Sequence, residues 1–136
     1  MDREQLEQWI KKHEGYEDNI YMCSAGKLSI GYGRNLQDNG ISKDEAEYLF
    51  DSDINRTYKD LSTISWYHQT PTAIQDALFN MCFNLGLSRL LTFKKMIKAI
   101  LEKNYNQAAR EALDSKWAKQ VGDRAKDIAL MIRNAK

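Results

Sequence analysis

The sequence has 136 residues, a length that suits one compact domain or two small lobes sharing a core. Hydrophobic residues make up 43% and charged residues 29%, so the chain is expected to fold without disulfide bonds. The 20 basic and 19 acidic side chains leave a net charge of +1, which argues against a general nucleic-acid-binding protein.

The N-terminal region predicts one helix followed by a β-hairpin. Apolar residues recur at helical spacing from about Asp2 to His13, and Gly15 is expected to end the helix just after Glu14. Residues 19–34 are rich in Ile, Tyr and Ser, and Gly26 in their middle is typical of a hairpin turn. We expect a third short strand to follow. The apolar face of the helix comprises Leu6, Trp9, Ile10 and His13.

The middle of the chain is predicted to hold a long helix. Gly40 ends a polar loop that follows the hairpin. Ser42 and Glu45 then match the capping-box pattern, in which each side chain accepts a hydrogen bond from the other residue's backbone N–H. A helix is therefore expected to begin here and to run to about Ser62, with a loop over residues 65–69.

The second half is predicted to be helical. Thr70 is expected to cap a helix that has Pro71 at its first position and Gly86 just past its end. Apolar side chains cover more than a narrow stripe of this helix, which predicts that it forms the core: Ile74, Leu78, Phe79, Met81, Cys82 and Leu85. Three shorter helices are expected at about residues 93–103, 105–114 and 123–134.

Charge is divided unevenly between the two halves. Residues 1–68 carry a net charge of −5, and residues 69–136 carry a net charge of +6. A solvated helical surface explains the basic half, and a basic face suited to an anionic polymer is the alternative. The sign of the charge alone does not choose between them.

Cysteine usage and the N-terminus bear on the expected compartment. Cys23 and Cys82 form no CxxC pair and no histidine cluster accompanies them, so no metal site is predicted and both thiols are expected to be reduced. The first five residues carry charges where a secretory signal has an apolar run. No stretch approaches the ~20 apolar residues of a membrane span, so stable membrane insertion is not expected.

Glu14 is a candidate general acid. At the end of a helix with a packed apolar face, its carboxyl would meet the negative pole of the helix and partial desolvation, which both favour the protonated form. A protonated carboxyl can protonate a leaving oxygen. A single Glu at a helix end is more often an ordinary surface residue, so the neighbouring residues decide.

Glu14, Cys23 and Ser29 follow one another with eight and then five residues between them. This segment resembles the catalytic segment of the phage-type lysozymes, a family of glycoside hydrolases. That family has a Glu, an Asp or Cys, and a Thr at this spacing, and Ser29 replaces the Thr. Three further segments resemble the family in the same order: residues 41–50, 80–86 and 115–125.

The resemblance implies an α+β, lysozyme-like two-lobe fold in a single domain of residues 1–136. A β-hairpin lobe of about residues 15–41 would be joined by a connecting helix, about 42–64, to a helical lobe formed by about 65–136 together with 1–14. It also implies a peptidoglycan hydrolase that uses no metal or cofactor. Such an enzyme cleaves the β-1,4 bond between N-acetylmuramic acid and N-acetylglucosamine in the glycan strands.

Catalytic roles follow from the resemblance. Glu14 would protonate the glycosidic oxygen, and Ser29 would hold the attacking water of an inverting hydrolysis; a strand hydroxyl bonded to nearby backbone is the alternative for Ser29. Cys23 would take the place of the Asp, although a small buried strand residue is the other interpretation. As a mainly protonated thiol it is expected to give weaker electrostatic help, unless neighbouring cationic groups restore the thiolate.

The resemblance also implies supporting and substrate-binding residues. Arg124 is expected to pair with Glu14 across the cleft, and His13 and Arg34 stand beside the catalytic group where other members carry different residues. Met96 occupies another cleft position, although a Met at helical spacing is more often part of the core. The expected sugar-binding residues are Asn35, Phe83, Asn84 and Glu111.

Two other classes of function remain open. Cys23 acting as a nucleophile, with His13 or His68 as its base, would make a peptidase of cell-wall peptides. A lysozyme fold without catalysis would make a murein-binding module.

The resemblance implies the biological setting of a phage endolysin. The expected protein is a monomer that stays in the host bacterial cytoplasm until lysis and then acts on the cell wall. A separate holin-type protein would permeabilise the membrane. Peptidoglycan glycan strands are the expected partner, and nucleic acid is not.

Overall fold

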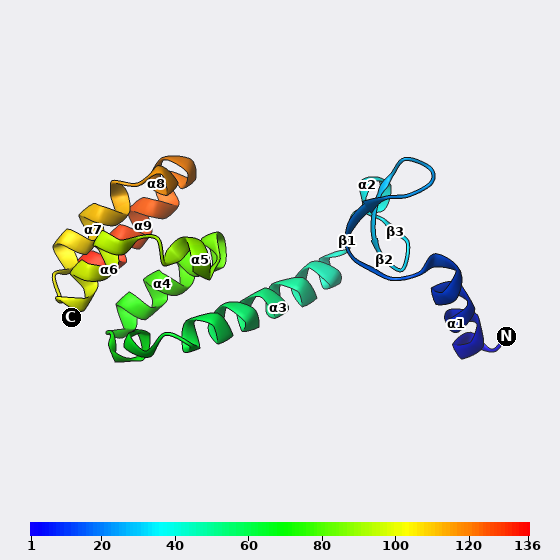
Figure 1. Ribbon diagram of the computed structural model, residues 1–136, viewed down its shortest axis with the longest axis horizontal. Helices are drawn as coiled ribbons and strands as arrows, with labels where there is room; N and C mark the ends of the chain where they lie inside the picture. The colour runs from blue at the N-terminus through cyan, green and yellow to red at the C-terminus, as the bar shows by residue number, and fades with distance from the viewer. The chain divides into compact units, whose positions relative to one another are not determined.

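A computed structural model gives the structure of residues 1–136. It contains a three-stranded antiparallel sheet, nine α-helices and one 3-10 helix, η1 (Figure 1). This combination confirms the α+β class. The chain divides into two compact units, Met1–Tyr48 and Leu49–Lys136. That residues 1–14 pack with the helical lobe stays a prediction.

The first unit begins with helix α1, Arg3–Glu14, as predicted. The Asp2 side chain caps it by accepting a hydrogen bond from the Gln5 backbone N–H, at 3.2 Å. Gly15 ends the helix with φ of +72°, and Glu14 is the last helical residue. Within this unit α1 buries none of its side chains.

The sheet follows α1 and confirms the predicted hairpin and third strand. Strand β1, Glu17–Met22, pairs with β2, Leu28–Gly31, which pairs with β3, Arg34–Asn35. Gly26, with φ of +77°, lies in the turn between β1 and β2, where the left-handed backbone favours glycine.

Two helices complete the first unit and lead out of it. A short helix α2, Leu36–Asn39, replaces the polar loop expected there, because the Asn35 side chain accepts a hydrogen bond from the Asp38 backbone N–H at 3.0 Å. Helix α3, Lys43–Ser62, begins with the predicted capping box. The Glu45 N–H donates to Ser42 Oγ at 3.1 Å, and the Ser42 N–H donates to Glu45 Oε1 at 2.8 Å.

The turn before the central helix differs from the prediction. Residues Ser65–Gln69 form η1 rather than an irregular loop. Helix α4 spans Thr72–Leu85, with Pro71 rather than Thr70 at its N-cap. The prediction of a Thr70 cap is wrong because the Thr70 hydroxyl donates to the Tyr67 carbonyl at 2.7 Å instead.

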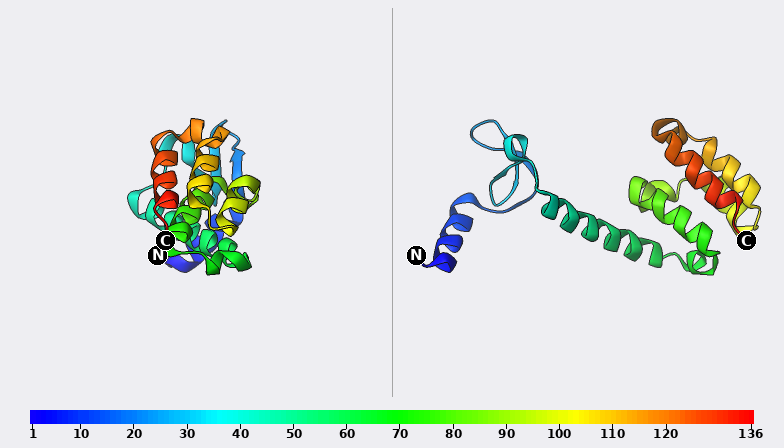
Figure 2. Two further views of the ribbon diagram at one scale, coloured as in Figure 1. Left: turned by 90° about the vertical axis from the view of Figure 1, so that its left-hand side faces the viewer. Right: turned by 180° about the vertical axis from the view of Figure 1, so that it is seen from behind.

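Five helices follow α4, where three were expected. The predicted ones are α6, Lys94–Leu101; α7, Tyr105–Leu113; and α9, Asp123–Arg133. The additional ones are α5, Leu87–Leu90, and α8, Lys116–Val121. Figures 1 and 2 show α7 and α9 side by side in the second unit.

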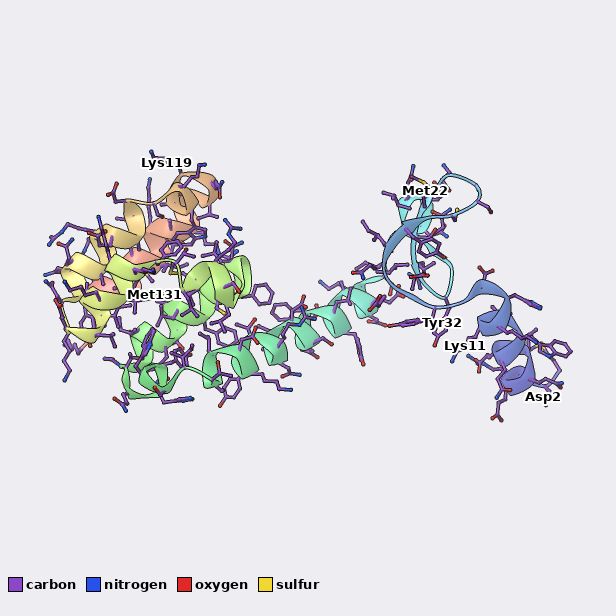
Figure 3. All side chains as sticks on the ribbon, viewed as in Figure 1. Asp2, Lys11, Met22, Tyr32, Lys119 and Met131 are labelled. Atoms are coloured by element: carbon purple, nitrogen blue, oxygen red, sulfur yellow. The ribbon has the colours of Figure 1, made fainter.

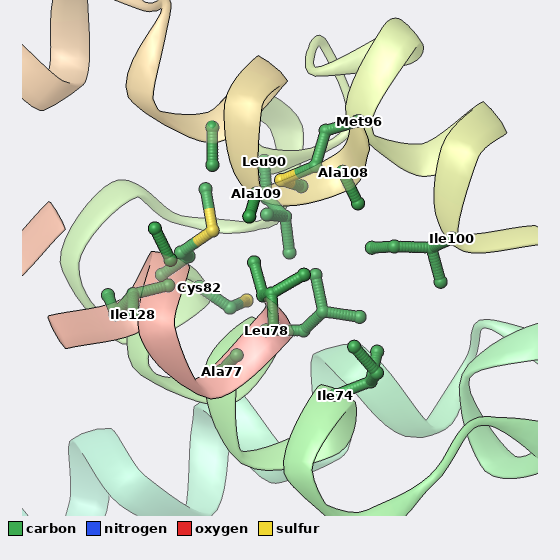
Figure 4. Close-up of a cluster of buried hydrophobic side chains, with 14 of the residues drawn as sticks. Ile74, Ala77, Leu78, Cys82, Leu90, Met96, Ile100, Ala108, Ala109 and Ile128 are labelled. Atoms are coloured by element: carbon green, nitrogen blue, oxygen red, sulfur yellow. The ribbon is translucent and has the colours of Figure 1, made fainter. Parts of the chain in front are cut away.

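The hydrophobic core lies in the second unit and is centred on α4, as predicted. Figure 4 shows Leu78 and Cys82 among side chains from α6, α7 and α9. Ile74, Leu78 and Met81 are fully buried, and Phe79 packs against the core from a partly buried position. Burial of one such side chain contributes about 1.5–3 kcal/mol. None of the helices combines the length and the apolarity that crossing a bilayer requires.

Candidate active site

The Glu14 carboxylate lies against Gly33, in the turn between β2 and β3. A Cβ on Gly33 would collide with Glu14 Oε2 and would lie 2.9 Å from its Cδ. The φ of Gly33 is +80°, which also favours glycine. The end of α1 and this turn therefore both determine where the Glu14 carboxylate lies. The sequence interpretation missed this role of Gly33.

Cys23 and Ser29 come together at the turn between β1 and β2. Ser29 lies on β2 and is only 2% exposed. Its hydroxyl donates to the Lys27 carbonyl at 3.2 Å, and it contributes to lowering the pKa of the Cys23 thiol. The local backbone bond of the alternative interpretation is thus present, and the hydroxyl oxygen retains its capacity to accept.

Backbone amides lower the pKa of Cys23. The Lys27 N–H has the largest effect and the Ala25 N–H the next, while desolvation opposes them and the Ser29 hydroxyl adds to them. The causes of the lowered pKa are hydrogen-bond donors of the turn, whereas the sequence interpretation considered neighbouring cations. Whether Cys23 is a thiolate stays a prediction.

Arg34 fixes the start of α3 to the sheet. Its guanidinium donates to Glu45 Oε1 at 3.0 Å and to Oε2 at 2.5 Å, and it also donates to the Gly40 carbonyl at 3.1 Å. This pair lowers the pKa of Glu45 to about 2 and raises the pKa of Arg34. Arg34 therefore connects β3, which follows Gly33 directly, to the start of α3.

The other predicted residues of the first unit have simpler surroundings. His13 is exposed at the end of α1 and makes no hydrogen bond. Asn35 uses its side-chain oxygen to cap α2, and its amide donates to Asp38 Oδ2 at 3.0 Å. Neither placement tests contact with a sugar.

The same unit contains an aromatic pair. The rings of Tyr16 and Tyr32 lie 5.3 Å apart, and Lys11 Nζ lies 5.0 Å from the centre of the Tyr32 ring. Figure 3 labels Lys11 and Tyr32. The sequence interpretation assigned these three side chains no role. Their contact joins α1 to the β2–β3 turn.

In the second unit, Phe83 and Arg124 line the same cavity of about 340 Å³. The Phe83 ring lies 5.7 Å from the Phe50 ring. Arg124 Nε donates to Asn80 Oδ1 at 2.8 Å, and its Nη2 donates to the Asn80 carbonyl at 3.3 Å. The expected pairing of Arg124 with Glu14 would join the two units and stays a prediction.

A second cavity of this unit, of about 480 Å³, is lined by Glu111, Met96 and Trp117 among others. Asn84 Oδ1 accepts a hydrogen bond from Trp117 Nε1 at 2.8 Å, and Glu111 Oε1 accepts one from Gln107 at 2.9 Å. Met96 is 1% exposed and belongs to the core. No group of three or more His, Cys, Asp or Glu side chains is placed to hold a metal ion.

Comparison with known proteins decides the family. A family model described as phage lysozyme matches residues 11–136, which include Glu14, Cys23 and Ser29. The chain belongs to the phage lysozyme family. The resemblance seen in the sequence is thereby confirmed for nearly the whole chain.

Relatives of this phage lysozyme family member come from an amoeba and from a phage. It is 32% identical to "Probable T4-type lysozyme 1" of Dictyostelium discoideum over 68% of this chain and 56% of that protein. It is 28% identical to "Probable T4-type lysozyme 2" of the same organism over 90% of each chain. It is 30% identical to the "Endolysin" of Acyrthosiphon pisum secondary endosymbiont phage 1, over 81% of this chain and 75% of that protein. The match thus spans little more than half of the first of these relatives.

Proposed function

We propose that this protein is a lysozyme-type peptidoglycan hydrolase. Its membership of the phage lysozyme family, and relatives named lysozyme and endolysin, support this function. The observation that carries the proposal is the local arrangement in the first unit. The Glu14 carboxylate lies against Gly33, Cys23 lies in the turn between β1 and β2, and Ser29 follows that turn on β2.

The proposed reaction is hydrolysis of the β-1,4 bond between N-acetylmuramic acid and N-acetylglucosamine. Glu14 donates its proton to the glycosidic oxygen as the bond from that oxygen to the anomeric carbon breaks. A water molecule attacks the anomeric carbon from the opposite face and releases a proton to solvent. This attack on the opposite face inverts the configuration at that carbon. Glu14 then regains its proton from solvent.

Ser29 and Cys23 act on the attacking side in this mechanism. The Ser29 hydroxyl already donates to the Lys27 carbonyl, so it would position the water by accepting a hydrogen bond from it. Cys23 would take the second catalytic role; the turn amides lower its pKa and so favour the thiolate, whose negative charge would stabilise the anomeric carbon as it becomes positive. The side chain of His13, the histidine of the same unit, makes no hydrogen bond to Cys23, so the proposal assigns no base to Cys23 for covalent attack.

Arg124 and four side chains complete the proposal for substrate contact. Arg124 would pair with the Glu14 carboxylate, as the resemblance to the family implies. The proposed sugar contacts are Asn35, Phe83, Asn84 and Glu111. The aromatic ring would cover a sugar face, and the amides would bond to the N-acetyl groups.

Digestion of purified peptidoglycan in heavy-oxygen water tests the reaction. Mass analysis should find one solvent oxygen at the new sugar end, and Glu14→Gln should release almost no fragments under the same conditions. An anhydro sugar end would indicate a lytic transglycosylase. An intact glycan with cut peptides would indicate a peptidase, and binding without cleavage would indicate a wall-binding module.

We further propose an endolysin role. A monomer would remain in the host bacterial cytoplasm until a holin-type protein opened a path to the wall. The relative named endolysin supports this setting. Expression with and without a holin in a bacterial host tests it, because lysis should require both proteins.

A further inference from the structure

The larger cavity of the second unit has a basic rim that the proposed catalytic mechanism does not use. Arg89, Lys94, Lys95 and Lys116 are among the residues that line this cavity of about 480 Å³. Glu111 and Asp114 are its acidic members, so the lining residues carry a net charge of +2. All of them belong to one unit.

The four cations have no partner in the protein. None takes part in an ion pair, and none of their side chains makes a hydrogen bond. Glu111, by contrast, already accepts a hydrogen bond from Gln107 at 2.9 Å. Asp114, like the cations, takes part in no ion pair, so four positive and two negative charges leave the lining with a net positive charge.

The backbone adds to this positive potential. Helix α6 begins at Lys94 and has no side-chain cap, so the positive pole of its dipole lies at the rim. The Ser115 hydroxyl oxygen is already used within the protein. It caps α8 by accepting a hydrogen bond from the Ala118 N–H at 3.1 Å.

The apolar members of the lining are Phe93, Met96 and Trp117. Trp117 is 3% exposed, and its indole N–H is bound to Asn84. The Phe93 ring meets Trp117 edge to face, with the ring centres 6.0 Å apart. A concave apolar wall beside several unpaired cations suits an anionic group attached to a larger body.

We propose that this cavity binds an oxyanionic group of the bacterial wall. The group is a carboxylate of peptidoglycan or a phosphate of a polymer attached to it, since both present the same anionic oxygens. The inference rests on the proposed function in taking the wall as the substrate. It assigns to Arg89, Lys94, Lys95 and Lys116 a role in substrate preference.

A binding experiment with matched charge changes tests the cavity. The pair Lys94→Gln and Lys95→Gln removes two rim charges, whereas Lys98→Gln and Lys119→Gln remove two exposed charges of the same unit that lie outside the lining. Both pairs are placed in a Glu14→Gln background so that the wall stays intact. Cosedimentation measures binding to peptidoglycan stripped of phosphate polymers, to the same material with amidated carboxyls, and to peptidoglycan that retains its phosphate polymers.

The rim pair should weaken binding about tenfold on an anionic wall, and the control pair less than twofold. If the rim pair weakens binding to peptidoglycan stripped of phosphate polymers, and amidation of its carboxyls removes this difference, the bound group is a carboxylate. A loss only on wall with phosphate polymers assigns it to a phosphate. Equal losses for both pairs, or no loss for the rim pair on any wall, would overturn the proposal.

Activity separates this proposal from the proposed function. If the unmodified protein cleaves no glycan and the rim pair still weakens binding selectively, the proposed hydrolase function is wrong and the proposed anion-binding cavity is supported. If the protein cleaves glycan and both pairs bind alike, hydrolysis stands and the cavity fails.

Discussion

Different interactions stabilise each of the two units. Every buried hydrophobic side chain lies in the second unit, within Leu49–Lys136. In the first unit, Met1–Tyr48, the buried residue is Ser29, and polar contacts such as Arg34 with Glu45 connect the elements. The proposed catalytic residues belong to the unit without an apolar core. Their positions depend on turns, caps and glycine conformations, so stability and activity should respond to different substitutions.

The largest effect should come from the core of the second unit. Leu78→Ala leaves a cavity at a fully buried position and should lower the free energy of unfolding by about 2–5 kcal/mol. Urea denaturation followed by circular dichroism measures it. Leu130→Ala on α9, where the side chain is 53% exposed, should change stability by less than about 0.5 kcal/mol. Similar losses for both variants would contradict the location of the core.

Gly33→Ala should reduce activity with little loss of fold. The added Cβ meets the Glu14 carboxylate, and displacement of the acid by about 1 Å lowers the rate by about 100-fold. Release of reducing ends from peptidoglycan measures the effect. Gly31→Ala is the matched control, because its φ of +70° gives similar backbone strain while nothing lies within 4 Å of its Cβ. Equal losses would mean that strain alone, and not contact with Glu14, explains the result.

Alkylation of Cys23 tests whether the first unit lowers the pKa of this thiol. Because turn amides lower its pKa, Cys23 should react with iodoacetamide at lower pH than the same thiol would without those amides, as measured on the unfolded chain. Cys82 is buried with a raised pKa and should react slowly. Mass spectrometry distinguishes the two sites.

The Ser29 hydroxyl lowers the pKa of Cys23 less than the turn amides do. Ser29→Ala should move the pKa of Cys23 upward, although less than the amides move it down. Ser24→Ala removes a neighbouring exposed hydroxyl that makes no contribution to the lowered pKa and should leave the alkylation profile unchanged. An unchanged profile in Ser29→Ala would exclude the contact.

The smallest effect should be the dependence of stability on acid. The pKa of Glu45 falls from 4.5 to about 2 on folding, so its pair with Arg34 stabilises the protein fully above pH 4.5. That contribution is lost as the pH falls toward 2. The melting temperature of Glu45→Gln should therefore differ from that of the unmodified protein at pH 6 and approach it at pH 2. Glu47→Gln, two residues along the same helix, provides the control. A difference that is unchanged at pH 2 would contradict the pairing.

Local signals predicted most of the secondary structure. The Ser42 and Glu45 capping box lies within one helical turn, so the sequence contains both partners. Helices α2 and α8 have side-chain caps as well, at Asn35 and Ser115, but their four and six residues carry too little periodicity to reveal them. Thr70 misled the prediction because its hydroxyl has an alternative acceptor one turn earlier.

The site was less predictable because its contacts depend on tertiary structure. The spacing of Glu14, Cys23 and Ser29 indicated the family, yet nothing in it showed that Gly33 receives the carboxylate. The lowered pKa of Cys23 depends on the orientation of amides in a turn. The basic rim joins residues from several helices, so its cations could be counted in the sequence but not located.

The rate of reducing-end release from purified peptidoglycan, compared between Glu14→Gln and Cys23→Asp, tests the assignment of the acid most directly. Glu14→Gln should lower the rate by about 10² to 10⁴-fold with unchanged circular dichroism, whereas Cys23→Asp should keep or increase the rate. An active Glu14→Gln variant, or complete loss in Cys23→Asp, would contradict catalysis by a Glu14 proton and would favour attack by the thiol.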